Sequence, residues 1–180
     1  MRMKVPEHEE RMMLEIALEA DEEWDSSRSW KQLAQKAAEA AIAESEYPEL
    51  AASDRPVEIS VTLTSDEQVR ELNAKWRKKD KPTNVLSFPM ADELDLSRAR
   101  IADAELLLGD IILAHGVCET ESREKAVTFQ DHATHLIVHG TLHLLGYDHQ
   151  DERDAEDMEE REIRALERLG IPNPYAVTAD

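Results

Sequence analysis

Three histidines in the C-terminal part of the chain have the spacing of a metal site. His139 and His143 are four residues apart in the segment HGTLHLLGYDH, and on a helix this spacing puts both imidazoles on one face. Gly146 can take a backbone conformation that other residues avoid, so the chain can turn and bring His149 back toward the first two. Three imidazoles with a fourth position open to water are typical of catalytic zinc. The pattern predicts one zinc ion per chain, although imidazole also suits nickel, iron or copper.

The alternative is that these histidines are ordinary core residues. The helix predicted around them is apolar on nearly every side, and burying three unpartnered imidazoles there would be costly, which favours the metal site. Two neighbours are candidates for a supporting position. His135 lies one turn before His139 and can support the site, contact substrate or have a structural role. Asp148 precedes His149 and can support the site or serve as a fourth ligand.

The residue after the first histidine limits the kind of hydrolase. The spacing H-x3-H-x5-H, with a glycine three residues after the second histidine, matches the metzincin proteases, in which a glutamate directly follows the first histidine and acts as general base. Here that position is Gly140. The ligand spacing is kept and the peptidase base is absent, which indicates a hydrolase in which another group manages the proton. A metallopeptidase with an unusual base stays open as an alternative.

A short basic segment interrupts an acidic chain. Residues 75–81 read KWRKKDK, with five basic residues in seven, whereas the whole chain has 40 acidic and 21 basic residues. Cations interleaved with an aromatic suit single-stranded nucleic acid, because cations contact phosphates and an indole stacks on a base. The candidate binding residues of this basic strip are Lys75, Trp76, Lys78, Lys79 and Lys81, with Arg77 among them. The alternative is a solvated helix end, where cations favour the macrodipole and Trp76 would anchor the core.

Composition and charge narrow the class of protein. The net charge of −19 taken alone argues against nucleic acid, because phosphate binders are usually basic. No apolar run approaches the ~18 residues of a membrane span, the N-terminal segment does not read as a signal peptide, and the single cysteine, Cys118, suits a reducing cytosol. We therefore expect a cytoplasmic protein without a membrane partner, in which Cys118 is buried. The acidic segment 151–162 is interpreted as a solvated helix face without a catalytic role.

The elements that must position these residues follow from apolar periodicity. Strands are predicted at 14–20, 57–63, 84–88 and 106–114, the last with a bulge or close approach at Gly109 and Asp110. Helices are predicted at 30–45, 65–77, 122–145 and 151–169, and a polar loop at 91–104. Strands and helices interleave in one domain, residues 1–180. The predicted fold class is α+β, a small mixed β-sheet packed by helices, with the metal at the end of the long helix.

Three segments resemble the YbeY family of bacterial single-zinc endoribonucleases. The segment LNAKWRKKDKPTNVLSFP at 72–89 is similar to the family's LN-x-x-[YF]-R-x-x-D-x-PT-[DN]-VLSFP. LLGDIIL at 107–113 is similar to its GDI strand, and HGTLHLLGYDH at 139–149 fits its zinc signature. Their order and spacing are family-like and span most of residues 57–175. Trp76 departs from the usual Tyr or Phe but keeps the aromatic character.

The resemblance implies an activity and a substrate. It implies that His139, His143 and His149 are zinc ligands and that Arg77 is functionally important, stabilising charge on the transferring phosphoryl group as arginine clamps do. The implied reaction is hydrolysis of phosphodiester bonds in single-stranded RNA. The implied context is 16S rRNA 3′-end maturation and ribosome quality control, with the small ribosomal subunit as partner. A non-catalytic ribosome-assembly factor with a structural zinc is a further alternative, which a fourth protein ligand would support.

Overall fold

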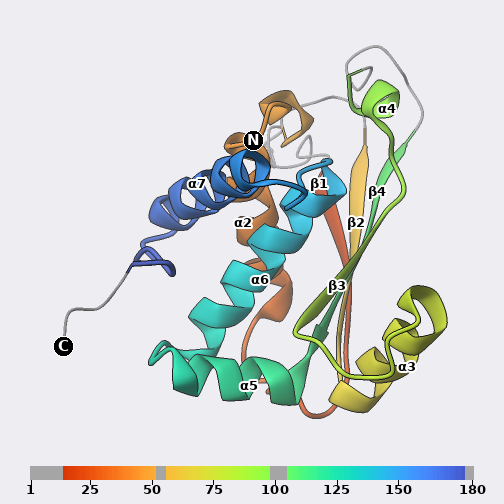
Figure 1. Ribbon diagram of the computed structural model, residues 1–180, viewed down its shortest axis with the longest axis vertical. Coiled ribbons are helices and arrows are strands. Elements are labelled where there is room, and N and C mark those ends of the chain that lie inside the picture. The colour runs from red at the N-terminus through yellow and green to blue at the C-terminus, as the bar shows by residue number, and fades with distance from the viewer. Residues whose placement is uncertain (1–13, 52–55, 98–104, 177–180) are drawn as a thin grey trace, which may run out of the picture.

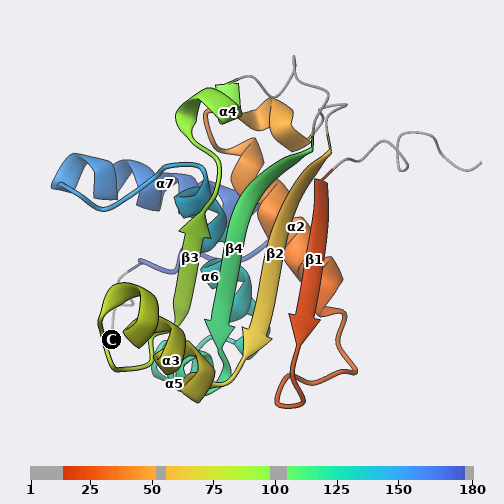
Figure 2. The same ribbon diagram turned by 90° about the vertical axis from the view of Figure 1, so that its right-hand side faces the viewer.

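The strands form one small mixed sheet. The computed structural model describes residues 14–51, 56–97 and 105–176, and within them the strand order is β1–β2–β4–β3 (Figure 1, Figure 2). The strands are β1 (Leu14–Ala20), β2 (Val57–Thr64), β3 (Val85–Pro89) and β4 (Leu106–Ala114). β1, β2 and β4 are parallel, and β3 is antiparallel to β4. The predicted mixed sheet is therefore confirmed.

Helices cover both faces of this sheet. α2 (Trp30–Ala43) and α6 (Phe129–Leu144) lie against one face, α3 (Asp66–Arg77) lies against the other, and α7 (Glu152–Arg168) packs on the outer side of α2 and α6 (Figure 1, Figure 2). The shorter elements are η1 (Pro48–Ala51), α4 (Glu93–Ser97) and α5 (His115–Glu124). No helix in the described ranges is both long enough and apolar enough to cross a membrane.

The main core lies between the sheet and the pair α2 and α6. The alternation in β2 buries Val57, Ile59 and Val61 completely, because successive strand residues point to opposite faces. Alanines fill the inner face of α2, which lets this helix lie close to its neighbours. Cys118 is also fully buried, and burial, with nearby Glu121 and Glu119, raises its pKa to about 12. The prediction of a small buried residue at this position is confirmed.

Gly109 lets two other segments approach β4. Its φ is +143°, and a Cβ there would collide with the carbonyl oxygen of Phe88 and lie 2.8 Å from Leu144 Cδ2. The register between β2 and β4 shifts between Glu58 and Ile59, which leaves one extra residue in β4. The predicted bulge and the predicted close approach are therefore both present. At Gly109, β3 and the C-terminal end of α6 both pack closely against β4.

The single long helix predicted at 122–145 is wrong. The chain forms two helices there, because α5 ends at Glu124 and Ala126 takes a positive φ of 56°. Thr128 then caps α6, with its side chain accepting a hydrogen bond from Asp131 N at 3.1 Å. Thr128 and Asp131 have the T-x-x-D spacing that starts a helix. That spacing was the sequence signal for the break.

The polar segment 91–104 is only partly a loop. α4 forms within it at Glu93–Ser97, where Asp92 Oδ1 accepts a hydrogen bond from Asp95 N at 2.8 Å and Leu96 is buried. The prediction of a continuous loop is wrong for this turn, and residues 98–104 lie outside the described part. The other predicted helices and strands agree with the structure to within two residues at each end.

Candidate metal centre

His139 and His143 project from one face of α6. Their Nε2 atoms are 3.0 Å apart and their ring centroids are 4.5 Å apart. The opposite side of this helix packs on the sheet, since a Cβ built on Gly140 would lie 3.0 Å from Ile111 Cγ2. One side of α6 therefore faces the sheet, and the other side carries His139 and His143. The residue after the first histidine is directed into the core.

A sharp exit from α6 returns His149 to the other two histidines. Gly146 has a φ of +98°, and Gly146 N donates to His143 O at 3.0 Å. Asp148 Oδ1 then accepts a hydrogen bond from His149 N at 2.7 Å, which fixes the backbone of the turn. The His149 ring stacks 5.3 Å from the His139 ring. One ligand atom from each of the three histidines lies within 4.8 Å of the others, so one ion can reach all three.

The His143 ring offers a neutral nitrogen to such an ion. Burial and the neighbouring His139 lower the pKa of His143 to about 4, against a smaller opposite effect of Asp148. An imidazole with this pKa is unprotonated near neutral pH, and a metal binds the unprotonated nitrogen. Asp148 itself contacts the backbone of His149 and the side chain of Gln150. Its carboxylate does not join the group of ligand atoms found among the described residues.

Glu162 supports the site from behind. This residue of α7 is fully buried, and its Oε2 accepts a hydrogen bond from His139 Nδ1 at 2.7 Å. Its Oε1 lies 2.8 Å from His135 Nε2 and accepts the Tyr175 hydroxyl at 2.6 Å. Burial raises the pKa of Glu162, but the hydrogen bonds from His135, His139 and Tyr175 outweigh it and hold the pKa well below its usual range. The carboxylate is therefore ionised.

The solvated-face interpretation of the segment 151–162 is wrong for Glu162. The sequence contained a signal, because Glu162 follows Met158 by four residues and precedes Ala165 by three, and both of these are buried. A carboxylate in the apolar stripe of an amphipathic helix needs a buried partner. The sequence did not reveal that this partner is a histidine pair on another helix. Nor did it give any signal for Tyr175.

Arg77 lines the same cavity as His139 and His143. This cavity of about 430 Å³ is walled by Arg77, Asn84 and Ser87 on one side and by His139 and His143 on the other. Arg77 is the last residue of α3, and its Nη2 donates to the Ser87 carbonyl at 3.1 Å. Its guanidinium also lies 5.7 Å from the centre of the Phe88 ring. The arginine is thus held at the metal cavity by β3.

The whole basic strip, Arg77 included, is exposed to solvent. Trp76 is 62% exposed, and Lys75 Nζ lies 5.0 Å from the centre of its ring. The alternative that Trp76 anchors the core is therefore wrong. Lys78 ends α3 in a left-handed conformation, and Lys78, Lys79 and Lys81 are exposed. Apart from Arg77, none of the predicted binding residues is among those that line the described metal cavity.

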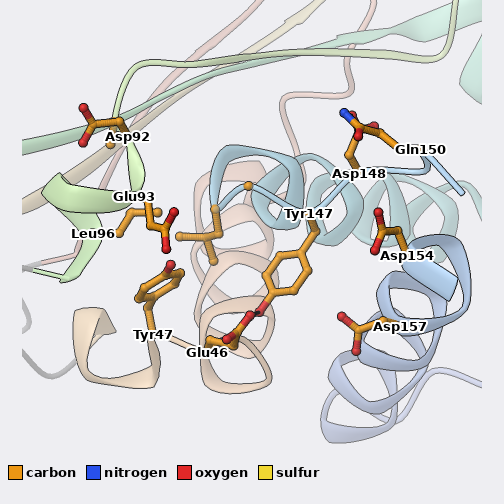
Figure 3. A pocket seen from close by; sticks show the side chains of 13 residues that line it. Glu46, Tyr47, Asp92, Glu93, Leu96, Tyr147, Asp148, Gln150, Asp154 and Asp157 are labelled. Carbon is orange, nitrogen blue, oxygen red and sulfur yellow. Dashed lines mark hydrogen bonds between the residues drawn. The ribbon is translucent and has the colours of Figure 1, made fainter.

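A second cavity, of about 550 Å³, adjoins the first and is lined by acidic side chains. Both cavities share the turn of Gly146, Tyr147 and Asp148. Figure 3 shows the acidic side chains around it, contributed by the segments near η1, α4 and α7, and the Tyr147 hydroxyl directed toward Glu46. The acidic lining residues are Glu46, Asp92, Glu93, Asp148, Asp154 and Asp157. The acidic lining of this cavity disfavours phosphate, and Arg77 lines only the first of the two cavities.

Comparison with known proteins places the chain in a family. The family model described as Endoribonuclease YbeY matches residues 15–170. A protein named Endoribonuclease YbeY from Rhizorhabdus wittichii is 50% identical over 169 residues, which cover 93% of this chain and 100% of the relative. One of the same name from Zymomonas mobilis is 48% identical over 165 residues, covering 89% and 93%.

A solved structure has a similar fold. The solution structure of a Thermotoga maritima protein matches with a TM-score of 0.50 and 25% sequence identity, over 88% of this chain and 92% of that one. The family match spans nearly the whole described chain and includes the three histidines, Glu162 and Arg77. The chain therefore belongs to the YbeY family of endoribonucleases.

Proposed function

We propose that this chain is a zinc-dependent endoribonuclease that hydrolyses single-stranded RNA, with one zinc per chain. The observation that carries the proposal is the convergence of three histidine nitrogens within 4.8 Å, with two of these histidines, His139 and His143, lining a cavity that Arg77 also lines. The relatives named Endoribonuclease YbeY support RNA as the substrate. The proposed context is 16S rRNA 3′-end maturation and ribosome quality control in the cytoplasm, with the small ribosomal subunit as partner.

The donor set fits zinc. His139, His143 and His149 supply three imidazoles, and the described residues offer no fourth protein ligand to this group. Such a set leaves one coordination position for water or substrate, as in catalytic zinc sites. The hydrogen bond from His139 Nδ1 to Glu162 leaves His139 Nε2 free as the ligand atom. When bound, zinc would act as a Lewis acid that activates water and polarises a phosphoryl oxygen.

Arg77 is the residue proposed to stabilise the reacting phosphate. Its Nη2 donates a hydrogen bond to the Ser87 carbonyl, and the guanidinium has further N–H donors for phosphoryl oxygens. The Phe88 ring and β3 restrict its position, so little entropy is lost when it meets the charge that develops in the transition state. Around it, Lys75, Lys78, Lys79 and Lys81 are proposed to contact backbone phosphates, and the exposed Trp76 ring is proposed to stack on a base.

Two features weigh against the alternatives. A peptidase base directly after the first histidine would have to replace Gly140. A Cβ at this position points toward Ile111 in the sheet and away from the histidines. A structural zinc normally has four protein ligands, and Asp148, the nearest candidate, instead caps the turn at His149. The geometry favours an open, catalytic site.

The proposal is tested with metal-loaded protein and two RNAs, one single-stranded and one fully paired, with the product ends identified. We expect internal cleavage of the single strand, loss of cleavage on chelation, and recovery with zinc. Arg77→Glu should abolish cleavage and keep zinc. Arg123→Glu is the matched control, because it also reverses a charge in the last turn of a helix but lies on α5. Equal cleavage by the parent and the Arg77 variant would refute the catalytic role.

A further inference from the structure

We propose that Glu162 is the positioning residue of the metal site and that the C-terminal segment, through the Tyr175 hydroxyl, helps to set the metal affinity. This inference rests on the proposed metal-dependent function. It concerns three side chains that the histidine motif does not include: Glu162 on α7, His135 on α6 and Tyr175 beyond α7. Through Glu162, the Tyr175 hydroxyl near the C-terminal end of the described chain is connected to the metal-site residue His139.

The first step is the hydrogen bond between Glu162 and His139. Glu162 Oε2 lies 2.7 Å from His139 Nδ1. Since the carboxylate is an acceptor, Nδ1 carries the proton and Nε2 keeps its lone pair, which is directed toward His143 Nε2 at 3.0 Å. The contact thus selects the tautomer and fixes the ring plane. A carboxylate in this position also makes the imidazole a better ligand.

The second step is what holds Glu162 itself. Its side chain is completely buried, so an ionised carboxylate there needs compensating donors. Two of these act on Oε1, namely His135 Nε2 at 2.8 Å and the Tyr175 hydroxyl at 2.6 Å. With Oε1 occupied in this way, Oε2 faces His139. If the donors on Oε1 are lost, the carboxylate is free to rotate and its hold on His139 weakens.

The third step is how the chain delivers Tyr175. α7 ends at Arg168, Gly170 takes a φ of +75°, and Ile171 N donates to Leu166 O at 2.9 Å. This turn sends the chain back along α7, and the Tyr175 ring packs edge-on against His135 at 5.5 Å between centroids. Tyr175 is still 38% exposed. It is therefore the most accessible member of the three.

α6 offers an internal comparison. One turn before His135, His132 Nε2 lies 2.7 Å from Glu121 Oε1, and His132 is also buried. This pair matches the His135–Glu162 pair in chemistry and distance. Its carboxylate contacts Asn84 rather than a metal-site histidine. Glu121→Gln is therefore a control for the loss of a histidine–carboxylate pair as such.

The experiment measures the zinc affinity of metal-free protein by competition with a chromophoric chelator, and so does not depend on activity. Glu162→Gln should weaken zinc binding by about 10- to 100-fold. Tyr175→Phe keeps the ring and removes one donor, and should weaken it by about 3- to 10-fold. The double variant should bind as Glu162→Gln does, within about twofold, because Tyr175 acts through Glu162. Glu121→Gln should leave zinc affinity unchanged.

A second readout separates positioning from general destabilisation. Nitrogen-15 shifts of the His139 ring in metal-free protein should show the proton on Nδ1 in the parent and a mixture of tautomers in Glu162→Gln. Parental zinc affinity in both Glu162→Gln and Tyr175→Phe would overturn the inference, as would additive losses in the double variant. If the parent itself bound no zinc, the proposed function would fail instead, so the two failures are distinguishable.

Discussion

The two sides of the histidine site are built differently. Behind it, Glu162 is fully buried and receives hydrogen bonds from His135, His139 and Tyr175. In front of it, Arg77 makes one hydrogen bond to a backbone carbonyl, and Trp76 is 62% exposed. The support side is fixed by one buried carboxylate and its three hydrogen-bond donors in a low-dielectric interior, where misplacement is costly. The open side keeps its cations available to a mobile polyanion.

This difference divides the expected effects of mutation. Changes on the support side should act on metal affinity and on folding, because their partners are buried. Changes on the open side should act on RNA binding or turnover and leave the metal in place, because exposed side chains contribute little to stability. An open-side substitution that removes the metal, or a support-side substitution that leaves metal affinity and folding unchanged, would contradict this distinction.

The largest effect is expected at Arg77. Arg77→Glu should lower single-turnover cleavage at saturating RNA by about 100-fold or more, since the reversed charge opposes the charge that develops on the phosphoryl group. Zinc content and thermal stability should stay parental. Saturating RNA removes the contribution of binding, so the rate reports on turnover alone. A parental rate under these conditions would show that Arg77 is not catalytic and would favour the alternative that the strip is a solvated helix end.

Gly140→Glu tests the core side of α6, which faces the sheet rather than the histidine site. A Cβ at this position already lies 3.0 Å from Ile111 Cγ2, and the carboxylate would enter the core without a partner. We expect the free energy of unfolding to fall by about 3 kcal/mol or more, as measured by urea denaturation. Gly140→Ala should cost much less, because the added methyl also favours the helix. The variant should gain no peptidase activity, and peptide cleavage by the parent would reverse the ranking of the two hydrolase types.

Lys78 and Lys79 should show smaller effects confined to binding. If each contacts one phosphate of single-stranded RNA, each change to Ala should reduce the slope of log affinity against log salt concentration by about 0.7. The cleavage rate at saturating RNA should stay near the parental value. Measuring affinity at four or five salt concentrations checks this. An unchanged slope in both variants would remove these lysines from the RNA interface.

The smallest effect is expected in the acidic cavity. Glu93 and Asp154 belong to its lining and are exposed. Glu93→Gln and Asp154→Asn should each raise RNA affinity by about threefold at most, because exposed charges interact weakly through water. Zinc affinity should not change. A loss of RNA affinity in either variant would show that RNA enters this cavity, contrary to its charge.

The sequence predicted the sheet and most helix limits because these depend on local patterns. The alternation in 57–63 and the capping residue Ser65 report on their own neighbourhoods, and the cap is formed by Gln68 N donating to Ser65 Oγ at 3.2 Å. The break before Thr128 was also encoded locally, but the apolar character of the following residues concealed it. Local pattern was thus sufficient, although one signal in it was overlooked.

The support of the site could not be predicted in the same way. His139 and Glu162 are 23 residues apart and lie on different helices, and Tyr175 is a further 13 residues along the chain. The apolar stripe of α7 contained a signal that Glu162 is buried, which the solvated-face interpretation overlooked, and it did not indicate which donors the carboxylate meets. The order of the partners around one carboxylate depends on how α6 and α7 pack. The motif of three histidines, by contrast, lies within 139–149 and was visible as a spacing.

The central claim is that one metal ion held by the three histidines is required to cleave RNA. The most direct measurement titrates metal-free protein with zinc and follows single-turnover cleavage of a single-stranded RNA, in the parent and in His143→Ala. The parent should gain cleavage that saturates at about one zinc per chain, and the variant should gain almost none, because losing one of three ligands opens the site. Equal activation of both proteins at one equivalent of zinc would contradict the account.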